Sequence, residues 1–355
     1  MPAALCPRIY TVLPAADLVA RGLAGYTLLF GSEINPDPIP TYGELRIHTF
    51  RHKAHCDLVY RLEIPNAVVH GPEGVVTIDR YALAESLTWT DPERSNSLQQ
   101  DGLWISLNLF VGRHLSKAEH LLCGHYTNYY HWLIDGLGRF AVSQARTDLL
   151  VPRCASNLRK NVLQDSGRTV IEVGPSEAVA VDCLFWTSNM TGFGGAFHPG
   201  LRLLGDRLFP TLVPGSQAKI YVSRRDSQRR RLINEEEVED FCRSRGFVVV
   251  TPSSLSVPDQ ARLFRGAQWI IAPHGASLVN SVFSYPGTAI LELLMDNYLN
   301  WCNRQLAACM QLQYGCVVGR SGAGDPKWVH GTPWTINLDR LALAVDDPMF
   351  GACAG

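Results

Sequence analysis

Lysine is scarce in this chain of 355 residues: its 32 basic residues comprise five lysines and 27 arginines. The formal net charge is −1 at pH 7, so the protein has no overall positive field with which to hold DNA or RNA. We therefore expect no nucleic-acid partner. An arginine-favouring composition explains most of the bias, although arginine also suits two-pronged recognition of phosphate and carboxylate groups.

Several short motifs of metal and cofactor chemistry are also missing. No CxxC pair occurs, which argues against a zinc ribbon and a thioredoxin-like redox site. Neither GxGxxG nor GxxxxGK[ST] occurs, so the dinucleotide fingerprint and the P-loop are absent. No DxD motif occurs either, which argues against a ligand bound through a divalent ion at such a motif. We expect no metal and no cofactor.

The ten cysteines are scattered along the chain, which is typical of small core residues in a reducing compartment. Cys302, Cys309 and Cys316 are spaced by seven, which we interpret as chance or as a buried helical stripe.

The first residues, MPAALCPRIY, do not combine a charged leader with an apolar run. The most apolar early stretch, residues 25–30, is too short to cross a bilayer, so we expect no transmembrane segment. These features predict a cytoplasmic protein, either free or peripheral at the inner face of the plasma membrane.

The first part of the chain is irregular, and the second is regular. Up to about residue 215, short alternating runs such as VVTIDRYAL predict strands, and PDPIP, GPEG and DPERSNS interrupt them. We expect an N-terminal domain over residues 1–215, with a hinge at 211–217. We expect a second domain over residues 216–325, and a tail, 326–355, that packs back on the first domain.

The second domain alternates strands and helices, which is typical of a doubly wound parallel sheet. Its helices are expected to begin at Asn234, in a capping-box-like start with Glu237, at Ser256, and after His274. Ligands of such sheets bind beyond the carboxyl ends of the strands, so the loops that follow them are the candidate binding loops. The predicted strands span residues 219–223, 247–251, 268–272 and 288–294.

An arginine loop, which we define as residues 224–231, follows the first of these strands. RRDSQRRR contains five arginines in eight residues ahead of a predicted helix, and Arg224, Arg225 and Arg230 are candidates for binding phosphate oxygens. A solvated loop that pairs with the glutamates of residues 235–237 is an equally open alternative.

Two further candidates lie on the neighbouring strands. In the turn PHGAS, Gly275 allows a ligand close to the backbone, and His274 can donate to a phosphate beside Ala276 and Ser277. A tight turn with an internally bonded histidine is the alternative. Glu292, inside the apolar run AILELL, needs a partner, which is either the diol of a ribose or a buried cation.

The stretch NYYHWLIDGLGR, residues 128–139, is mostly apolar but carries four polar side chains at helical spacing. On a helix, Asn128, His131, Asp135 and Arg139 share one face, and His131 and Asp135 can hydrogen-bond. Arg139 could reach a diphosphate or pair with Asp135. A buried His–Asp–Arg network that braces an interface is the alternative interpretation.

Together, residues of roughly 120–295 resemble glycosyltransferase family 61. The similarity rests on YVSRRDSQRRRLINEEEV, PSSLSVPDQARLFRGAQWIIAPHGASLVNSVF and PGTAILEL, while NYYHWLIDGLGRF looks like the Asn–His–Trp–Asp helix of the family. The resemblance implies a GT-B-like α/β fold, with two Rossmann-like domains facing a central cleft. It also implies inversion at the sugar, no metal and a nucleotide sugar, usually UDP-linked, as donor.

The resemblance further implies roles for individual residues. Arg224, Arg230, Asn234, His274, Gly275 and Glu292 would be on the donor side, and Asn128, His131 and Asp135 on the catalytic side. We expect His131 to be the general base and Asp135 to orient it, with the reverse assignment close behind.

The expected activity is hexosyl or pentosyl transfer to a hydroxyl of a glycan or a lipid-linked glycan. The absence of an anchor like that of eukaryotic members suggests a bacterial-type, capsular or exopolysaccharide enzyme. Two alternatives remain: a non-catalytic nucleotide- or sugar-binding protein on the same fold, and a metal-dependent hydrolase using His131 and Asp135.

Overall fold

The protein is described from a computed structural model, in which the chain forms two compact units. Unit 1 comprises residues 1–32 and 57–190, and unit 2 comprises residues 33–56 and 191–355. The structure describes residues 8–34, 41–43, 55–87, 98–101, 104–107, 111–143, 146–154, 159, 162–175, 177–191, 196–324, 328–348 and 350. The predicted breaks PDPIP and DPERSNS lie outside these residues.

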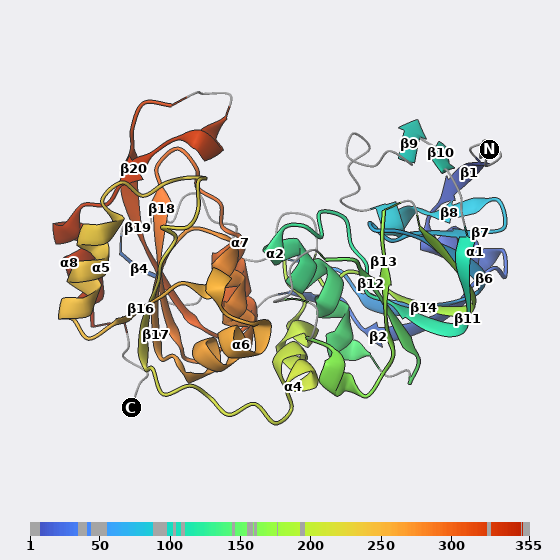
Figure 1. The fold of residues 1–355 in the computed structure, drawn as a ribbon, viewed down its shortest axis with the longest axis horizontal. Helices are drawn as coiled ribbons and strands as arrows, with labels where there is room; N and C mark the ends of the chain where they lie inside the picture. The colour runs from blue at the N-terminus through green and yellow to red at the C-terminus, as the bar shows by residue number, and fades with distance from the viewer. Residues whose placement is uncertain are drawn as a thin grey trace. The chain divides into compact units, whose positions relative to one another are not determined.

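Unit 1 is built on a mixed sheet of eleven strands (Figure 1). Its order is β13-β12-β11-β14-β6-β7-β8-β1-β10-β9, and β2 also pairs with β6. The strands are β1 (Arg8–Leu13), β2 (Gly25–Phe30), β6 (Val59–His70), β7 (Val75–Ile78), β8 (Tyr81–Leu83), β9 (Leu98–Asp101), β10 (Trp104–Leu107), β11 (Val111–His120), β12 (Asp148–Pro152), β13 (Val170–Val173) and β14 (Ala178–Thr187).

Only part of this sheet resembles a Rossmann sheet. The strands β13, β12, β11 and β14 run parallel, whereas β14 pairs with β6, and β6 with β7, in antiparallel ladders. The alternating run of residues 75–83 is confirmed as β7 and β8, and GPEG forms the turn before it. Leu18 of α1 (Ala15–Ala20) packs into the core of the sheet with Leu62, Val181 and Trp186.

Unit 2 contains the predicted parallel sheet, in the order β16-β15-β17-β18-β19-β20, with β4 (Thr41–Gly43) also pairing with β19. Each of the four predicted strands is present within two residues of its expected ends, and all four run parallel. The strands are β15 (Lys219–Val222), β16 (Val248–Val250), β17 (Trp269–Pro273), β18 (Ala289–Met295), β19 (Gln313–Ser321) and β20 (Trp334–Thr335).

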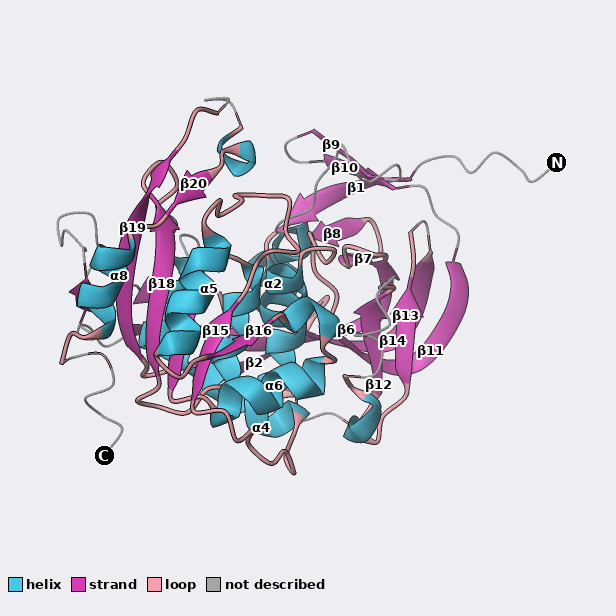
Figure 2. Ribbon diagram, turned by 60° about the vertical axis from the view of Figure 1, so that its left-hand side comes forward, coloured by secondary structure: helices cyan, strands magenta, loops and turns pink. Residues whose placement is uncertain are grey.

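Helices cover both faces of this sheet, which explains its apolar strands. In Figure 1, α5 (Glu235–Ser244) and α8 (Leu338–Val345) lie on one side of it, and α6 (Val257–Gly266) and α7 (Cys302–Cys309) on the other. Figure 2 shows the same strands from a second direction, with α8 beside β19. All seven residues of β18 are buried, including Glu292.

Two of the three predicted helix starts, those at Ser256 and Asn234, differ in their outcome. Ser256 caps α6, because its side chain accepts a hydrogen bond from the backbone nitrogen of Asp259. Asn234 precedes α5, but it makes no capping hydrogen bond with its side chain, so the capping-box prediction is wrong there. Gly246 ends α5 in the left-handed region, at a φ of 81°, as the sequence indicated.

The described part of the tail packs into the core of unit 2, and its predicted packing on the first domain stays a prediction. Trp334, Ile336, Leu341 and Val345 share one core with Leu291 of β18. The division between the units falls at residues 190 and 191, whereas the sequence suggested about 215. The apolar spacing of α8 fits a helix that buries one face, but it did not indicate which sheet would receive that face.

Candidate functional site

The candidate donor side lies at the carboxyl edge of the sheet in unit 2. Strands β15, β17 and β18 are neighbours in parallel register, so their carboxyl ends meet at one edge. The arginine loop follows β15, the turn 274–277 follows β17, and Tyr298 follows β18. This edge is where open parallel sheets bind their ligands.

Arg224 lies directly against the backbone of the turn after β17. A Cβ placed on Gly275 would overlap Nη1 of Arg224, so glycine at position 275 leaves the space that the guanidinium occupies. Nη2 of Arg224 donates to Oγ of Ser227 at 3.0 Å. Burial, followed by the charge of Arg230, lowers the pKa of Arg224 to about 10, which still leaves a full positive charge at neutral pH.

A buried carboxylate fixes the start of the arginine loop. Oε1 of Glu235 accepts hydrogen bonds from the backbone nitrogen of Arg224 at 2.6 Å, from Tyr221 at 3.2 Å and from Ser223 at 3.3 Å. Burial raises the pKa of Glu235, but these donors favour its ionised form. The loop therefore leaves the sheet in a defined direction, which places Arg224 at Gly275.

The arginines of the loop divide between the two interpretations that the sequence left open. Arg225 lies within 3.8 Å of Glu236 and 3.6 Å of Glu239 on α5, which is the solvated ion pairing of the alternative. The guanidinium of Arg230 instead lies over the ring of Tyr298, at 5.2 Å from its centroid. Donor binding by Arg225 stays a prediction that its present pairing disfavours.

His274 and Glu292 form a buried polar cluster beneath this edge. Nδ1 of His274 lies 2.6 Å from Oε1 of Glu292, and the same oxygen accepts from Asn303 at 2.6 Å. Oε2 of Glu292 accepts from the hydroxyl of Tyr314 at 2.5 Å. Glu292 has no exposed surface, so these internal partners supply the hydrogen bonds that the hydroxyls of a ribose were expected to supply. Its contact with a ribose stays a prediction, and the geometry favours a role in orienting His274.

The remaining donor-side candidates are placed less directly. Asn234 exchanges two hydrogen bonds with the backbone of Ile336, at 2.8 and 3.1 Å, so both ends of its amide are engaged by the tail. Ala276 and Ser277 begin the short 3₁₀ helix η8 (Ala276–Phe283) and are half-buried. Their predicted contacts with a donor stay predictions.

In unit 1, the stretch NYYHWLIDGLGR folds as a helix of changing type and not as a regular α-helix. It passes from α2 (Tyr129–His131) through the π-helical η3 (Trp132–Gly136) to the 3₁₀ helix η4 (Leu137–Val142). Asn128 caps its start, since its side chain accepts from the backbone nitrogen of Tyr130 at 3.0 Å. π-Helical turns occur frequently at functional sites.

His131 and Asp135 do form the expected pair. Nδ1 of His131 lies 2.6 Å from Oδ2 of Asp135. The side chain of His131 is 21% exposed and that of Asp135 is 4% exposed. In the neutral ring, Nδ1–H donates a hydrogen bond to the carboxylate and the lone pair is on Nε2, so the histidine is the partner that can meet a substrate.

Arg139 is directed into unit 1, near enough to Asp135 for the charge of that carboxylate to act on the Arg139 guanidinium. Nη1 of Arg139 donates to the carbonyl oxygen of Leu122 at 2.6 Å and lies 3.1 Å from Nδ1 of His120, while Nη2 donates to Asn189. Only 4% of Arg139 is exposed. This burial disfavours the substrate contact predicted for Arg139 and supports the alternative of a structural network.

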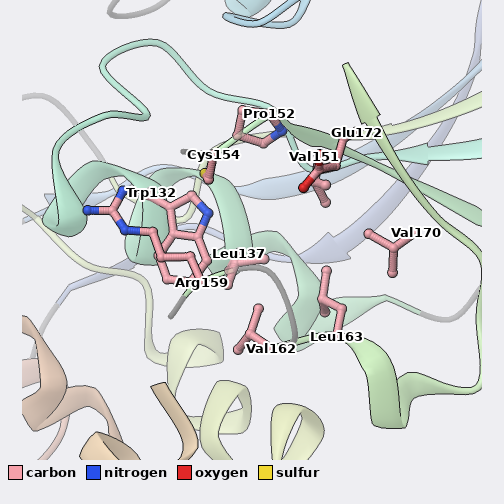
Figure 3. Close-up of a pocket in the computed structure, with 10 residues that line it drawn as sticks. All are labelled: Trp132, Leu137, Val151, Pro152, Cys154, Arg159, Val162, Leu163, Val170 and Glu172. Carbon is pink, nitrogen blue, oxygen red and sulfur yellow. The ribbon is translucent and has the colours of Figure 1, made fainter. Parts of the chain in front are cut away.

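Arg159 holds the loop that leads into this helix. Nη1 of Arg159 donates to the carbonyl oxygen of Tyr126 at 3.1 Å and to that of Thr127 at 3.4 Å. Its guanidinium also lies over the rings of Tyr129 and Trp132, at 5.4 and 5.3 Å. Figure 3 shows Arg159 beside Trp132 at a small pocket, with Cys154 and Leu137 on its other walls. The contacts position the first turn of the helix, and hence His131.

Several residues of these sites were not identified from the sequence. Tyr298 lies in the loop after β18, which the strand pattern did mark as a candidate binding loop. The elements that contain Asn303, Tyr314 and His330 were either not predicted or assigned elsewhere. His125, in the left-handed region at a φ of 53°, has its ring 5.5 Å from that of His131. Within the described ranges, no group of three or more His, Cys, Asp or Glu side chains is placed to hold a metal ion, and no helix is long and apolar enough to cross a membrane.

Comparison with known proteins gives two matches. The family model of glycosyltransferase 61 matches residues 129–291. A protein of Oryza sativa subsp. japonica, named as the β-1,2-xylosyltransferase XAX1, is 27% identical over 167 residues. That alignment covers 41% of this chain and 29% of the rice protein, so the chain spans less than a third of the length of this relative. Both matches support a similarity to glycosyltransferase family 61, and the family model covers the segment that contains the His131–Asp135 pair and the arginine loop.

Proposed function

We propose that the protein is an inverting, metal-independent glycosyltransferase that moves a sugar from a UDP-linked donor to a hydroxyl group of a glycan. The observation that carries the proposal is the packing of Arg224 against Gly275 at the carboxyl edge of the sheet, with His274 beside it. A guanidinium fixed at this edge next to bare backbone is a site for a diphosphate.

The proposed reaction uses one base and one group of cations. Nε2 of His131 takes the proton of the acceptor hydroxyl, with Asp135 holding Nδ1 and stabilising the imidazolium. The acceptor oxygen then bonds to the anomeric carbon from the face opposite the leaving group. The carbon–oxygen bond to UDP breaks, its electron pair leaves with the diphosphate, and the configuration inverts. Arg224 and Arg230 would stabilise the negative charge that develops on the departing diphosphate.

The exposures of the two side chains support His131 as the base over the reverse assignment. Asp135 is buried and already accepts from His131, whereas Nε2 of His131 is the basic atom of the partly exposed partner. These roles, with the base in unit 1 and the donor-binding arginines in unit 2, fit a GT-B arrangement, in which one domain binds the acceptor and the other binds the donor.

The donor and acceptor are proposed from the matches and the site together. The name of the rice relative suggests a pentose, and family 61 suggests a glycan acceptor at the cell surface, free or lipid-linked. A cytoplasmic location, with peripheral attachment at the membrane, and a bacterial capsular or exopolysaccharide role belong to the same proposal.

A donor screen tests the proposal. UDP-, GDP- and CMP-sugars are compared by thermal shift with and without a chelator, because a ligand that binds the folded state raises the unfolding temperature. We expect UDP-xylose or a related UDP-sugar to give the largest rise, unchanged by the chelator, and its sugar to be transferred to a glycan acceptor with inversion. Binding without transfer to any acceptor would support a non-catalytic sugar-binding protein, and activity lost with the chelator would support a metal-dependent reaction.

A further inference from the structure

A histidine of the C-terminal segment lies within hydrogen-bond distance of the arginine loop. Nδ1 of His330 lies 2.8 Å from Nη1 of Arg230. Arginine can only donate, so Nδ1 must be the acceptor in this pair, and the ring must be neutral with its proton on Nε2. The observed arrangement therefore fixes both the charge and the tautomer of His330.

Backbone contacts tie this histidine to the loop. The backbone nitrogen of Arg230 donates to the carbonyl oxygen of His330 at 2.8 Å, and Nε1 of Trp334 donates to the carbonyl oxygen of Arg230 at 2.8 Å. Arg230 itself has a φ of 52°, a left-handed conformation that is uncommon in residues other than glycine and that the surrounding bonds must maintain. His330 is thus held at the site and is not a chance neighbour of it.

Positive charge and aromatic rings surround His330. The ring of Tyr298 lies edge-on between those of His330 and His274. Its centroid is 4.9 Å from that of His330 and 5.5 Å from that of His274. Burial first, and then the charges of Arg230, Arg229 and His274, lower the pKa of His330. An anion beside these groups would offset their repulsion and raise that pKa again.

We propose that His330 is a ligand of the donor diphosphate and that it takes up a proton when the donor binds. The proton enters from solvent at Nδ1, so that atom no longer accepts from Arg230. Arg230 and the imidazolium are then both free to donate to phosphate oxygens. In the absence of a donor, the neutral ring holds Arg230 in place. This inference rests on the proposed function, because it assigns a further residue to the same diphosphate site.

The sign of the pH dependence follows from the two states of the ring. His330 is neutral in the free protein at neutral pH and charged in the complex, so binding consumes a proton in the pH range between its two pKa values. Lowering the pH through this range should tighten UDP binding. One titrating group changes affinity by at most tenfold per pH unit, so we expect His330 to contribute roughly 3- to 10-fold between pH 7.5 and 5.5.

Calorimetry with UDP tests the inference. Titrations in two buffers of different ionisation enthalpy give the number of protons taken up at each pH. His330→Gln retains a side-chain acceptor for Arg230 but cannot titrate, and His114→Gln replaces an exposed histidine of unit 1 as the matched control. We expect the control to behave as the wild type, and His330→Gln to lose proton uptake and the tightening at low pH. Subtracting the variant from the wild type removes the ionisation of UDP itself.

The outcomes separate the two proposals. If UDP binds and His330→Gln takes up as many protons as the wild type, the role of His330 is wrong while the donor site stands. If neither UDP nor pyrophosphate binds the wild-type protein at any pH, both proposals fail.

Discussion

Unit 1 and unit 2 place arginine in opposite ways. Arg139 in unit 1 is buried and donates to backbone and amide groups of its own unit, whereas Arg224 and Arg230 in unit 2 lie at a strand edge beside glycine and aromatic rings. The first arrangement satisfies a cation in the interior of its own unit, and the second holds cations at the edge where we propose that an anion binds. The comparison shows that an arginine near a candidate site is informative only together with its partners.

The largest effect is expected from the base. His131→Ala should reduce sugar transfer by a factor of ~10² or more, because it removes the group that accepts the acceptor's proton. Asp135→Asn should cause a loss in the same direction, since an amide cannot stabilise the imidazolium. Transfer rates at saturating donor provide the measurement. Near-normal turnover of His131→Ala, in a protein whose circular dichroism is unchanged, would show that another residue is the base.

The second-largest effect tests whether Arg224 binds the donor diphosphate. Arg224→Ala should weaken UDP binding roughly 10- to 100-fold, because hydrogen bonds to charged groups contribute about 1.5–3 kcal/mol. Gly275→Ala should weaken it similarly, since the new methyl group occupies the space of the Arg224 guanidinium. Gly31→Ala is the control, because a Cβ at Gly31 meets no neighbour within 4 Å. Unchanged calorimetric affinity in both variants would move the diphosphate site elsewhere.

Arg139 should matter for folding and not for donor binding. Arg139→Ala leaves the carbonyl of Leu122 and the amide of Asn189 without their donor, and should destabilise unit 1 by about 2–4 kcal/mol. Arg113→Ala, which breaks an exposed contact with Glu177 in the same unit, should cost about 1 kcal/mol or less. Urea unfolding gives both values, and UDP affinity should be unaffected in either variant. Weaker UDP binding by Arg139→Ala at temperatures where it is folded would restore the predicted substrate contact.

The smallest effect is expected from Arg159. Arg159→Ala removes donors to the carbonyls of Tyr126 and Thr127, so the first turn of the helix and His131 with it should be held less firmly. We expect kcat to fall roughly 3- to 10-fold, a mild case of misplaced catalytic geometry, with the KM for donor unchanged. Arg159→Lys, which keeps the charge but not the planar fork, should recover part of the loss. A change in donor KM alone would contradict a positioning role.

The sequence predicted which loops meet at the carboxyl edge of the sheet in unit 2, because a parallel sheet makes spacing informative. Once β15, β17 and β18 are placed, their carboxyl ends must meet, so Arg224 and Gly275 come together although fifty residues separate them. Partners from outside that repeat could not be found in the same way. Glu292 meets Asn303 and Tyr314 through an unpredicted helix and strand, and Asn234 is engaged by Ile336 where a capping role was expected.

For the candidate catalytic side, the sequence predicted the contact between His131 and Asp135 but not the structure around it. Spacing by four brought His131 to Asp135, as expected. The same spacing did not reveal that the helix becomes π-helical at Trp132, nor that Arg139 turns towards His120 and Leu122. A Cβ on Gly136 would lie 3.1 Å from the carbonyl oxygen of Leu121 and 3.2 Å from the sulfur of Cys123, so this turn packs closely on residues 121–123, a tertiary contact that a helical wheel cannot represent.

The attachment of the C-terminal segment to the arginine loop affects how this protein can be dissected. Trp334 and Ile336 form hydrogen bonds with Arg230 and Asn234, so the contacts of the candidate donor side extend well past residue 291, where the match to the family model ends. A fragment trimmed to the matched region would lose Glu292 itself together with α7, β19 and β20, whose residues Asn303, Tyr314 and Trp334 contact Glu292 and Arg230. Chimeras that exchange donor preference between relatives should therefore transfer the arginine loop and the C-terminal segment together.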